Sequence, residues 1–121
     1  MDFADYLKQA KNIDMFLAPS NDWLAIDPLH THMARFRTIE QGFNLIRQTS
    51  NGRSVGADYT GNIISEMDDF VDNDKVLITQ LPTQGITTIY SKIGDTFIGV
   101  CILLFILLII KLKKEKPKAA K

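Results

Sequence analysis

The pattern of apolar residues separates a strongly apolar C-terminal segment from a mixed region before it. Residues 96–110 carry no charged side chain, and from Phe97 onward this run is unbroken. A membrane-spanning helix needs about 20 such residues. Residues 93–112 reach that length if Asp95 lies at one interface and Lys111 extends to the other. Because the run offers no polar face to water, we predict a transmembrane helix rather than a buried helix of a soluble protein.

The first part of the chain alternates between helical and extended patterns. Residues 2–12 predict a helix with one apolar stripe, formed by Phe3, Leu7 and Ala10. The short apolar run 13–18, closed by Pro19, is typical of a strand that is buried on both faces. A loop is expected over residues 20–26.

A second helix is predicted to begin at Asp27 and Pro28, with Asp27 as N-cap and Pro28 as the first helical residue. It should end near Gly42. Four apolar residues at helical spacing define the face that we expect to be buried: Leu29, Met33, Phe36 and Ile39.

The following residues predict a series of strands. A strand over 44–49 leads to Asn51-Gly52, which is a strong tight-turn signal. Residues 54–58 and 62–66 predict a hairpin, residues 67–74 an exposed loop with four aspartates, and residues 75–81 a further strand.

Residues 1–92 are therefore predicted to form an α/β domain with two helices and about five strands. Such a domain can bury only a thin core. A strand as apolar as 13–18 should have neighbours on both sides, and the chain offers few. The pattern thus indicates half of a larger sandwich.

Charge is divided unevenly along the chain. Residues 1–110 contain eight Lys and Arg against thirteen Asp and Glu, whereas residues 111–121 contain six Lys and one Glu. An acidic domain is not expected to bind nucleic acid. Short Lys-rich flanks stay cytoplasmic. Residues 113–121 are therefore predicted to be a basic cytoplasmic tail, and residues 1–92 to lie on the extracytoplasmic side of the membrane.

The N-terminus does not fit that orientation, because the segment 1–5, which contains two aspartates and no basic residue, does not resemble a secretory signal. Two arrangements resolve the conflict. In one, the chain is tail-anchored with its domain in the cytosol. In the other, which we favour, an upstream part with further membrane spans precedes Met1.

Few residues are suited to metal binding or covalent chemistry. The single cysteine, Cys101, lies inside the apolar run and is expected to be a small packing residue. His30 and His32 are two residues apart on a helix and point in different directions, so no metal site is expected. A partly buried ion-pair network is a structural possibility for three charged residues: Arg37, Glu40 and Arg47.

Candidate pocket residues follow the predicted buried strand 13–18. Ser20, Asn21, Asp22 and Trp23 lie at its C-terminal end, where α/β proteins commonly bind ligands. In one interpretation their polar groups orient a carbonyl and the indole covers an acyl chain. In the other they form an Asx-type turn with Trp23 packed in the core. His30 is a fifth candidate, in a packing or hydrogen-bonding role.

Three ordered blocks within residues 2–112 resemble the carbon–nitrogen hydrolase (nitrilase) superfamily, above all its membrane-bound branch, the apolipoprotein N-acyltransferases. The first block is Phe16-Leu17-Ala18-Pro19-Ser20-Asn21-Asp22-Trp23. The second comprises His30, Met33-Ala34-Arg35-Phe36-Arg37, Glu40, Gly42 and Leu45-Ile46-Arg47. The third comprises Thr49-Ser50-Asn51-Gly52, Asp58 and Gly61. The final apolar segment is also similar to that branch.

The resemblance implies the C-terminal half of a nitrilase-like αββα sandwich followed by one transmembrane helix. The superfamily uses a Glu base, an oxyanion-stabilising Lys and a nucleophilic Cys. Residues 2–6 are similar to the segment that follows this Cys, which places the nucleophile just before Met1 and leaves no catalytic residue in the chain. The chain alone is therefore expected to be inactive.

The resemblance further implies a bacterial-type plasma or inner membrane, phospholipid and lipoprotein substrates, and no cofactor. The parent activity would be N-acyl transfer from a phospholipid to a lipoprotein's N-terminal cysteine. Two alternatives stay open at this point. One is a tail-anchored binding or scaffold protein whose domain folds alone. The other is a fragment of a membrane-anchored amidase or nitrilase-like hydrolase.

Overall fold

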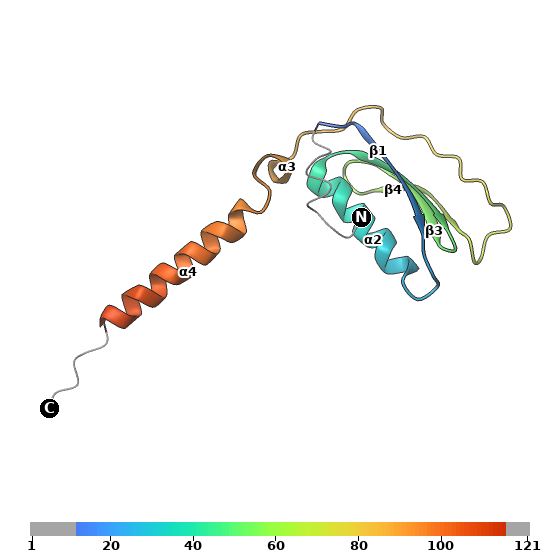
Figure 1. Ribbon diagram of the computed structural model, residues 1–121. Helices are drawn as coiled ribbons and strands as arrows, with labels where there is room; N and C mark the ends of the chain where they lie inside the picture. The colour runs from blue at the N-terminus through green and yellow to red at the C-terminus, as the bar shows by residue number, and fades with distance from the viewer. Residues whose placement is uncertain (1–11, 116–121) are drawn as a thin grey trace.

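The computed structural model describes residues 12–115, so the helix predicted over 2–12 lies almost entirely outside the described residues. Seven elements follow one another in this part of the chain (Figure 1). They are β1 (Met15–Asn21), α2 (Asp27–Gln41), β2 (Asn44–Ser50), β3 (Arg53–Ala57), β4 (Ile63–Asp68), α3 (Ile89–Ile93) and α4 (Thr96–Glu115).

The four strands form one mixed sheet in the order β1-β2-β3-β4. β1 and β2 are parallel, from Met15 opposite Asn44 to Asn21 opposite Ser50, and α2 is the crossover between them. β2, β3 and β4 are antiparallel neighbours. The predicted α/β fold is confirmed, together with the hairpin and the tight turn at Asn51, whose φ is +56°.

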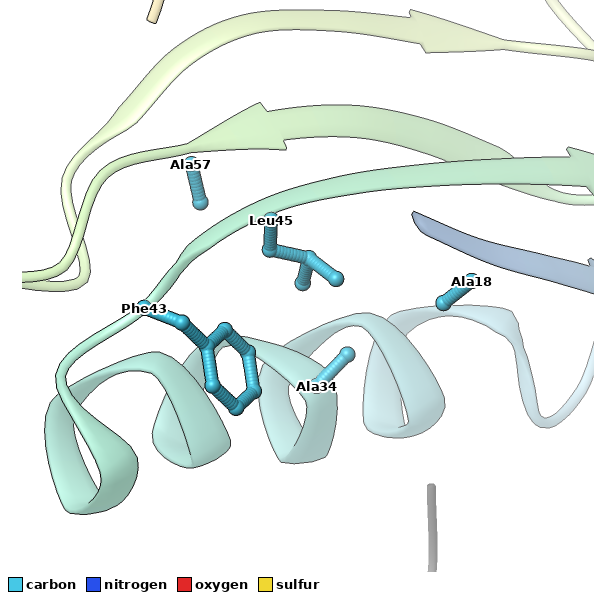
Figure 2. Close-up of a cluster of buried hydrophobic side chains, with 5 residues drawn as sticks. All are labelled: Ala18, Ala34, Phe43, Leu45 and Ala57. Carbon is cyan, nitrogen blue, oxygen red and sulfur yellow. The ribbon is translucent and has the colours of Figure 1, made fainter. Parts of the chain in front are cut away.

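A small core lies between α2 and the sheet. Figure 2 shows the side chains that form it, and all five are buried: Ala18, Ala34, Phe43, Leu45 and Ala57. Phe16 packs against this cluster, with its ring centroid 5.3 Å from that of Phe43. Because three of the five core residues are alanines, the helix approaches the sheet closely.

The predicted buried face of α2 is wrong. Leu29, Phe36 and Ile39 are exposed, and Met33 is only partly buried. The buried residues of the helix are instead mostly polar: Asp27, Thr31, Ala34, Thr38 and Gln41. Small and hydrogen-bonding side chains fit the narrow space above the sheet, as the Thr38 hydroxyl shows by donating to the carbonyl of Arg35 at 2.8 Å.

The start of α2 also differs from the prediction. The N-cap residue is Ile26, without a side-chain cap, and Pro28 lies in the first turn. Asp27 is buried and its carboxylate accepts a hydrogen bond from the backbone N–H of Arg53. A side chain at Gly52 would meet Asp22 and Asp27, so this turn closes tightly against the start of the helix.

β1 is not buried on both faces, contrary to expectation. Only Ala18 is fully buried, and Leu17 on the opposite face is 65% exposed. β1 is an edge strand of the described sheet because it pairs only with β2 there. One edge of the sheet and part of the face opposite α2 are therefore open within residues 12–115.

The strand predicted over 75–81 is absent from the described structure. These residues form an irregular segment that lies against the sheet, where a side chain at Gly56 would meet the side chain of Thr79. The aspartate-rich loop begins later than predicted, because β4 continues to Asp68. Lys75 forms an ion pair with Asp69 at 3.2 Å in this region.

Residues 84–88, which we call the connecting segment, are bound to the end of α2. The Ile86 N–H donates to the carbonyl of Gly42 at 2.7 Å, and the Thr88 hydroxyl donates to the carbonyl of Glu40. The Gly85 N–H donates to the Asp14 carboxylate at 2.9 Å. Thr88 then caps α3 through a capping box with Ser91.

α4 is the only described helix that is long and apolar enough to cross a membrane, over residues Thr96–Lys114. It begins three residues later than the predicted span because Gly94, with φ +55°, ends α3. Cys101 lies on the exposed surface of α4. The apolar C-terminal helix predicted from the sequence is thus present.

Candidate functional site

Four of the five candidate residues line one pocket at the C-terminal end of β1. The pocket has a volume of about 230 Å³, and its lining consists of Ala18, Pro19, Ser20, Asn21, Asp22, His30 and Arg47. Trp23 does not belong to this lining. The sheet brings these residues together because β1 and β2 are parallel, so that their C-terminal ends lie at the same end of the sheet.

Asp22 is at the centre of the pocket's hydrogen bonds. Its backbone N–H donates to the carbonyl of Ser50 at 3.0 Å, which continues the pairing of β1 with β2. Its side chain is almost completely buried. One carboxylate oxygen accepts from Arg47 Nη2 at 2.6 Å, and the other lies 2.9 Å from His30 Nδ1. The carboxylate thus joins β1, β2 and α2.

Arg47 was predicted to join a network with Arg37 and Glu40, and this is wrong. Arg37 pairs with Glu40 within α2, whereas Arg47 extends from β2 to Asp22. Its Nη2 also donates to Ser20 Oγ at 3.1 Å, and its Nη1 donates to Thr31 Oγ1 at 3.2 Å. The guanidinium therefore connects the C-terminal end of β1 with the buried face of α2.

Arg47 is a pocket residue that was not predicted from the sequence, although a signal was present. In β2 the residues 45, 47 and 49 point to the same face of the sheet, since side chains alternate along a strand. Leu45 and Thr49 are buried on that face, and so is Arg47. A buried arginine requires a paired acceptor, and Asp22 at the end of the adjacent strand supplies it.

The environment of Asp22 favours its ionised form. Burial by itself raises the pKa of this carboxyl, but the hydrogen bonds from Arg47 and His30 and the charges of these groups outweigh it. The pKa of Asp22 is consequently lowered below its usual value. At neutral pH the group is a carboxylate that accepts hydrogen bonds and does not supply a proton.

The other candidates occupy the rim of the pocket. His30 has the hydrogen-bonding role predicted for it, through Asp22. Trp23 is 60% exposed and is not packed in the core; its ring meets that of His30 edge-on, with 6.1 Å between centroids. Asn21 Oδ1 accepts hydrogen bonds from the Ser50 hydroxyl and from Asn51 Nδ2, which join the end of β1 to the tight turn.

This arrangement is suited to binding and orienting a polar group. The Ser20 hydroxyl accepts from Arg47 and lies 3.5 Å from an Asp22 oxygen, so it is part of the same network. The ion pair neutralises the charge of the pocket floor, and the exposed ring of Trp23 adds an apolar surface beside it. The pocket can therefore contact both a polar group and an adjoining apolar chain.

Comparison with known proteins identifies relatives for most of the chain. Apolipoprotein N-acyltransferase of Vibrio parahaemolyticus is 42% identical over 86 residues, which cover 67% of this chain and 16% of that protein. The enzyme of that name from Borreliella burgdorferi is 32% identical over 89 residues, 74% of this chain and 17% of the relative. That of Rhodopseudomonas palustris is 35% identical over 88 residues, which cover 73% of this chain and 16% of the relative.

No family model matches the chain, and no solved structure does. The three relatives named above nevertheless share one name, apolipoprotein N-acyltransferase, and that name implies the carbon–nitrogen hydrolase superfamily. They confirm the resemblance of this chain to the apolipoprotein N-acyltransferases. The chain spans only 16–17% of the length of these three relatives.

Proposed function

We propose that this chain is part of a membrane-bound N-acyltransferase of the carbon–nitrogen hydrolase fold. The parent enzyme would transfer an acyl chain from a phospholipid to the N-terminal cysteine of a lipoprotein. The observation that carries the proposal is the identity of 32–42% to apolipoprotein N-acyltransferases over most of the chain. Because the chain spans a small part of those enzymes, the activity belongs to the longer protein.

The shape of the sheet supports half of an αββα sandwich in residues 1–92. Within residues 12–115, α2 covers one face of the sheet, whereas β1 is an edge strand and Leu17 is exposed on the other face. In a two-sheet sandwich that other face packs against a second sheet. The second sheet and its helices would come from residues outside this chain. Residues 93–112 would form the membrane span and residues 113–121 the tail.

The proposed chemistry needs groups that the resemblance places outside the chain. A cysteine thiolate would attack the ester carbonyl of the phospholipid, releasing a lysophospholipid and forming a thioester. The amine of the lipoprotein's cysteine would then attack the thioester and release the thiolate. The only thiol of this chain is Cys101, on α4. We therefore propose that the chain alone has no acyltransferase activity.

The pocket at the end of β1 would contribute a wall to the parent's substrate site. The Asp22–Arg47 pair fixes the C-terminal end of β1, which carries Ser20 and Asn21. These side chains present hydroxyl and amide groups, and Trp23 presents an indole to an apolar chain. Such a wall suits an acyl ester, which combines a polar carbonyl with an alkyl chain.

The Lys-rich tail supports one orientation of the chain in the membrane. Short basic flanks stay in the cytoplasm, and five of the residues from 111 to 118 are lysines. We propose that residues 113–121 are cytoplasmic and that residues 1–92 lie on the outer side of a bacterial plasma or inner membrane.

An acylation assay with thiol trapping tests the proposal. The chain is incubated with labelled phospholipid, and thioesters are released with hydroxylamine, in parallel with a longer protein that extends upstream of Met1. We expect a thioester only in the longer protein, at a cysteine a few residues before Met1. A thioester on the chain alone, or an upstream reading frame without such a cysteine, would contradict the proposal.

A further inference from the structure

The outer side of α2 is apolar, although it faces away from the core. Leu29, Phe36 and Ile39 are 54%, 64% and 45% exposed. Trp23 and Leu24, just before the helix, are also exposed. We call these five residues the outer ridge. α2 therefore exposes large apolar side chains together with the polar His32, whereas the apolar side of an ordinary surface helix faces the core.

Such a surface indicates a partner. Single exposed apolar residues are common, but a contiguous group of large ones marks an interaction site. The three ridge residues that belong to α2 are spaced at i, i+7 and i+10, so they lie along one side of the helix. Burial of these side chains against a partner would be favoured by a free energy of about 25 cal/mol for each Å² of apolar surface removed from water.

The position of α2 relative to α4 identifies the partner. The connecting segment is hydrogen-bonded to Gly42 and to Glu40 at the C-terminal end of α2, and α3 packs on α2. Only Gly94 and Asp95 separate α3 from α4. Figure 1 shows α2 on the side of the sheet that faces α4. α2 is consequently the layer of the domain that is nearest to the start of the proposed membrane span.

We propose that the outer ridge contacts the surface of the lipid bilayer that α4 spans. This inference rests on the membrane insertion in the proposed function. Helices with an apolar side lie in the interface with that side among the headgroups and the first acyl carbons. Tryptophan is enriched at this depth because its ring is apolar and its N–H is polar. The domain would then be held by α4 and supported by α2.

Trp23 is the only tryptophan of the chain and reports on this contact directly. The full chain is reconstituted in phosphatidylcholine vesicles whose acyl chains are either brominated or unmodified. Bromine quenches indole emission only at short range. We expect a blue-shifted Trp23 emission and a clear loss of intensity in the brominated vesicles. The double variant Leu29→Ser/Phe36→Ser should lose much of this quenching.

Ile78→Ser is the matched control. Ile78 is 82% exposed, but it lies in the segment 75–81, away from α2. We expect its quenching to equal that of the unmodified chain. Circular dichroism of each variant verifies that the fold is retained, and both changes affect exposed side chains.

Vesicle flotation separates the two proposals. If the chain floats with the vesicles and Trp23 is not quenched, the bilayer contact is wrong and the membrane span stands. If the chain does not float, both are wrong. An emission that changes with the protein-to-lipid ratio but not with bromine indicates a second copy on the ridge, which would also overturn the proposal.

Discussion

The carboxylate of Asp22 accepts a hydrogen bond from Arg47 Nη2 at 2.6 Å, and both side chains are almost completely buried. Asp22 follows β1 and Arg47 belongs to β2, so the pair joins the two parallel strands at the edge where the pocket lies. Through Thr31 and His30 the same pair reaches α2. The geometry of the pocket at the C-terminal end of β1 therefore depends on this contact.

Removing one partner of the pair should strongly destabilise the domain. Asp22→Asn leaves the Arg47 guanidinium buried without its counter-charge, and an unpaired buried charge costs about 3–5 kcal/mol. We expect the free energy of unfolding to fall by that amount, measured by urea titration of the detergent-solubilised chain.

A surface pair provides the control for this measurement. Glu66 lies 3.6 Å from Arg53 and is about half exposed. Glu66→Gln should change the free energy of unfolding by less than about 1 kcal/mol. Equal effects of Asp22→Asn and Glu66→Gln would show that the Asp22–Arg47 pair does not have the structural role assigned to it.

The lowered pKa of Asp22 predicts a loss of stability in acid. Burial opposes ionisation, but the hydrogen bonds and charges of Arg47 and His30 outweigh it, so the folded pKa lies below the unfolded value of about 3.9. Between the two values the unfolded chain binds more protons, and the free energy of unfolding rises with pH. The contribution is complete above about pH 4 and is lost as the pH falls through the folded pKa.

Asp58 has a lowered pKa as well, so the acid response needs to be divided between two groups. Burial raises the Asp58 pKa, but hydrogen bonds from Thr60 and Asn62 lower it by more. Urea titrations from pH 2 to 6 should show a shallower slope in Asp22→Asn and, separately, in Asp58→Asn. An unchanged slope in Asp22→Asn would contradict an ionised Asp22 in the folded state.

Local patterns in the sequence were sufficient for the presence of the four strands, for the tight turn at Asn51 and for the C-terminal end of α2. These features depend on alternation, on turn residues and on a helix-stopping Gly42 with φ +80°. The pocket was also predictable in part, because Ser20 to Asp22 lie at the C-terminal end of a strand, where α/β proteins commonly bind ligands.

The burial of α2 could not be predicted in this way, because helical periodicity identifies an apolar side and does not say what covers it. Phe36 belongs to that side and is exposed, whereas Thr38 is completely buried against the sheet. The strand predicted over residues 75–81 was wrong for a related reason. Its alternation fits a strand, but pairing depends on a neighbouring strand edge, and these residues lie against the sheet at Gly56 instead.

Two phenylalanines test the revised core. Phe43 is completely buried and packs beside Phe16, whereas Phe36, which the sequence pattern placed in the core, is 64% exposed. Phe43→Ala should lower the free energy of unfolding by about 3–5 kcal/mol, since it removes a buried ring and leaves a cavity. Phe36→Ala in detergent should change it by no more than about 0.5 kcal/mol. Chemical unfolding monitored by circular dichroism would measure both, and the reverse order of effects would support the original assignment of the buried face.

Gly85 controls the attachment of the connecting segment to the domain. A Cβ at this position would clash with the carbonyl oxygen of Gly42, a backbone atom that cannot move without disturbing the end of α2. Gly85→Ala should therefore displace the connecting segment and break the hydrogen bond from the Ile86 N–H to that carbonyl. We expect faster hydrogen exchange over residues 84–88, detected by mass spectrometry of the chain in lipid nanodiscs.

Gly99→Ala is the matched control for this change, because a Cβ there would meet nothing within 4 Å and the residue lies inside α4. Its exchange over residues 84–88 should equal that of the unmodified chain. If Gly85→Ala also left this exchange unchanged, the connecting segment would be a loose tether. α2 would then not be held beside the start of α4, and the quenching of Trp23 in brominated vesicles should be weak. The exchange and the quenching therefore depend on the same attachment, and Gly85→Ala should raise the first and lower the second.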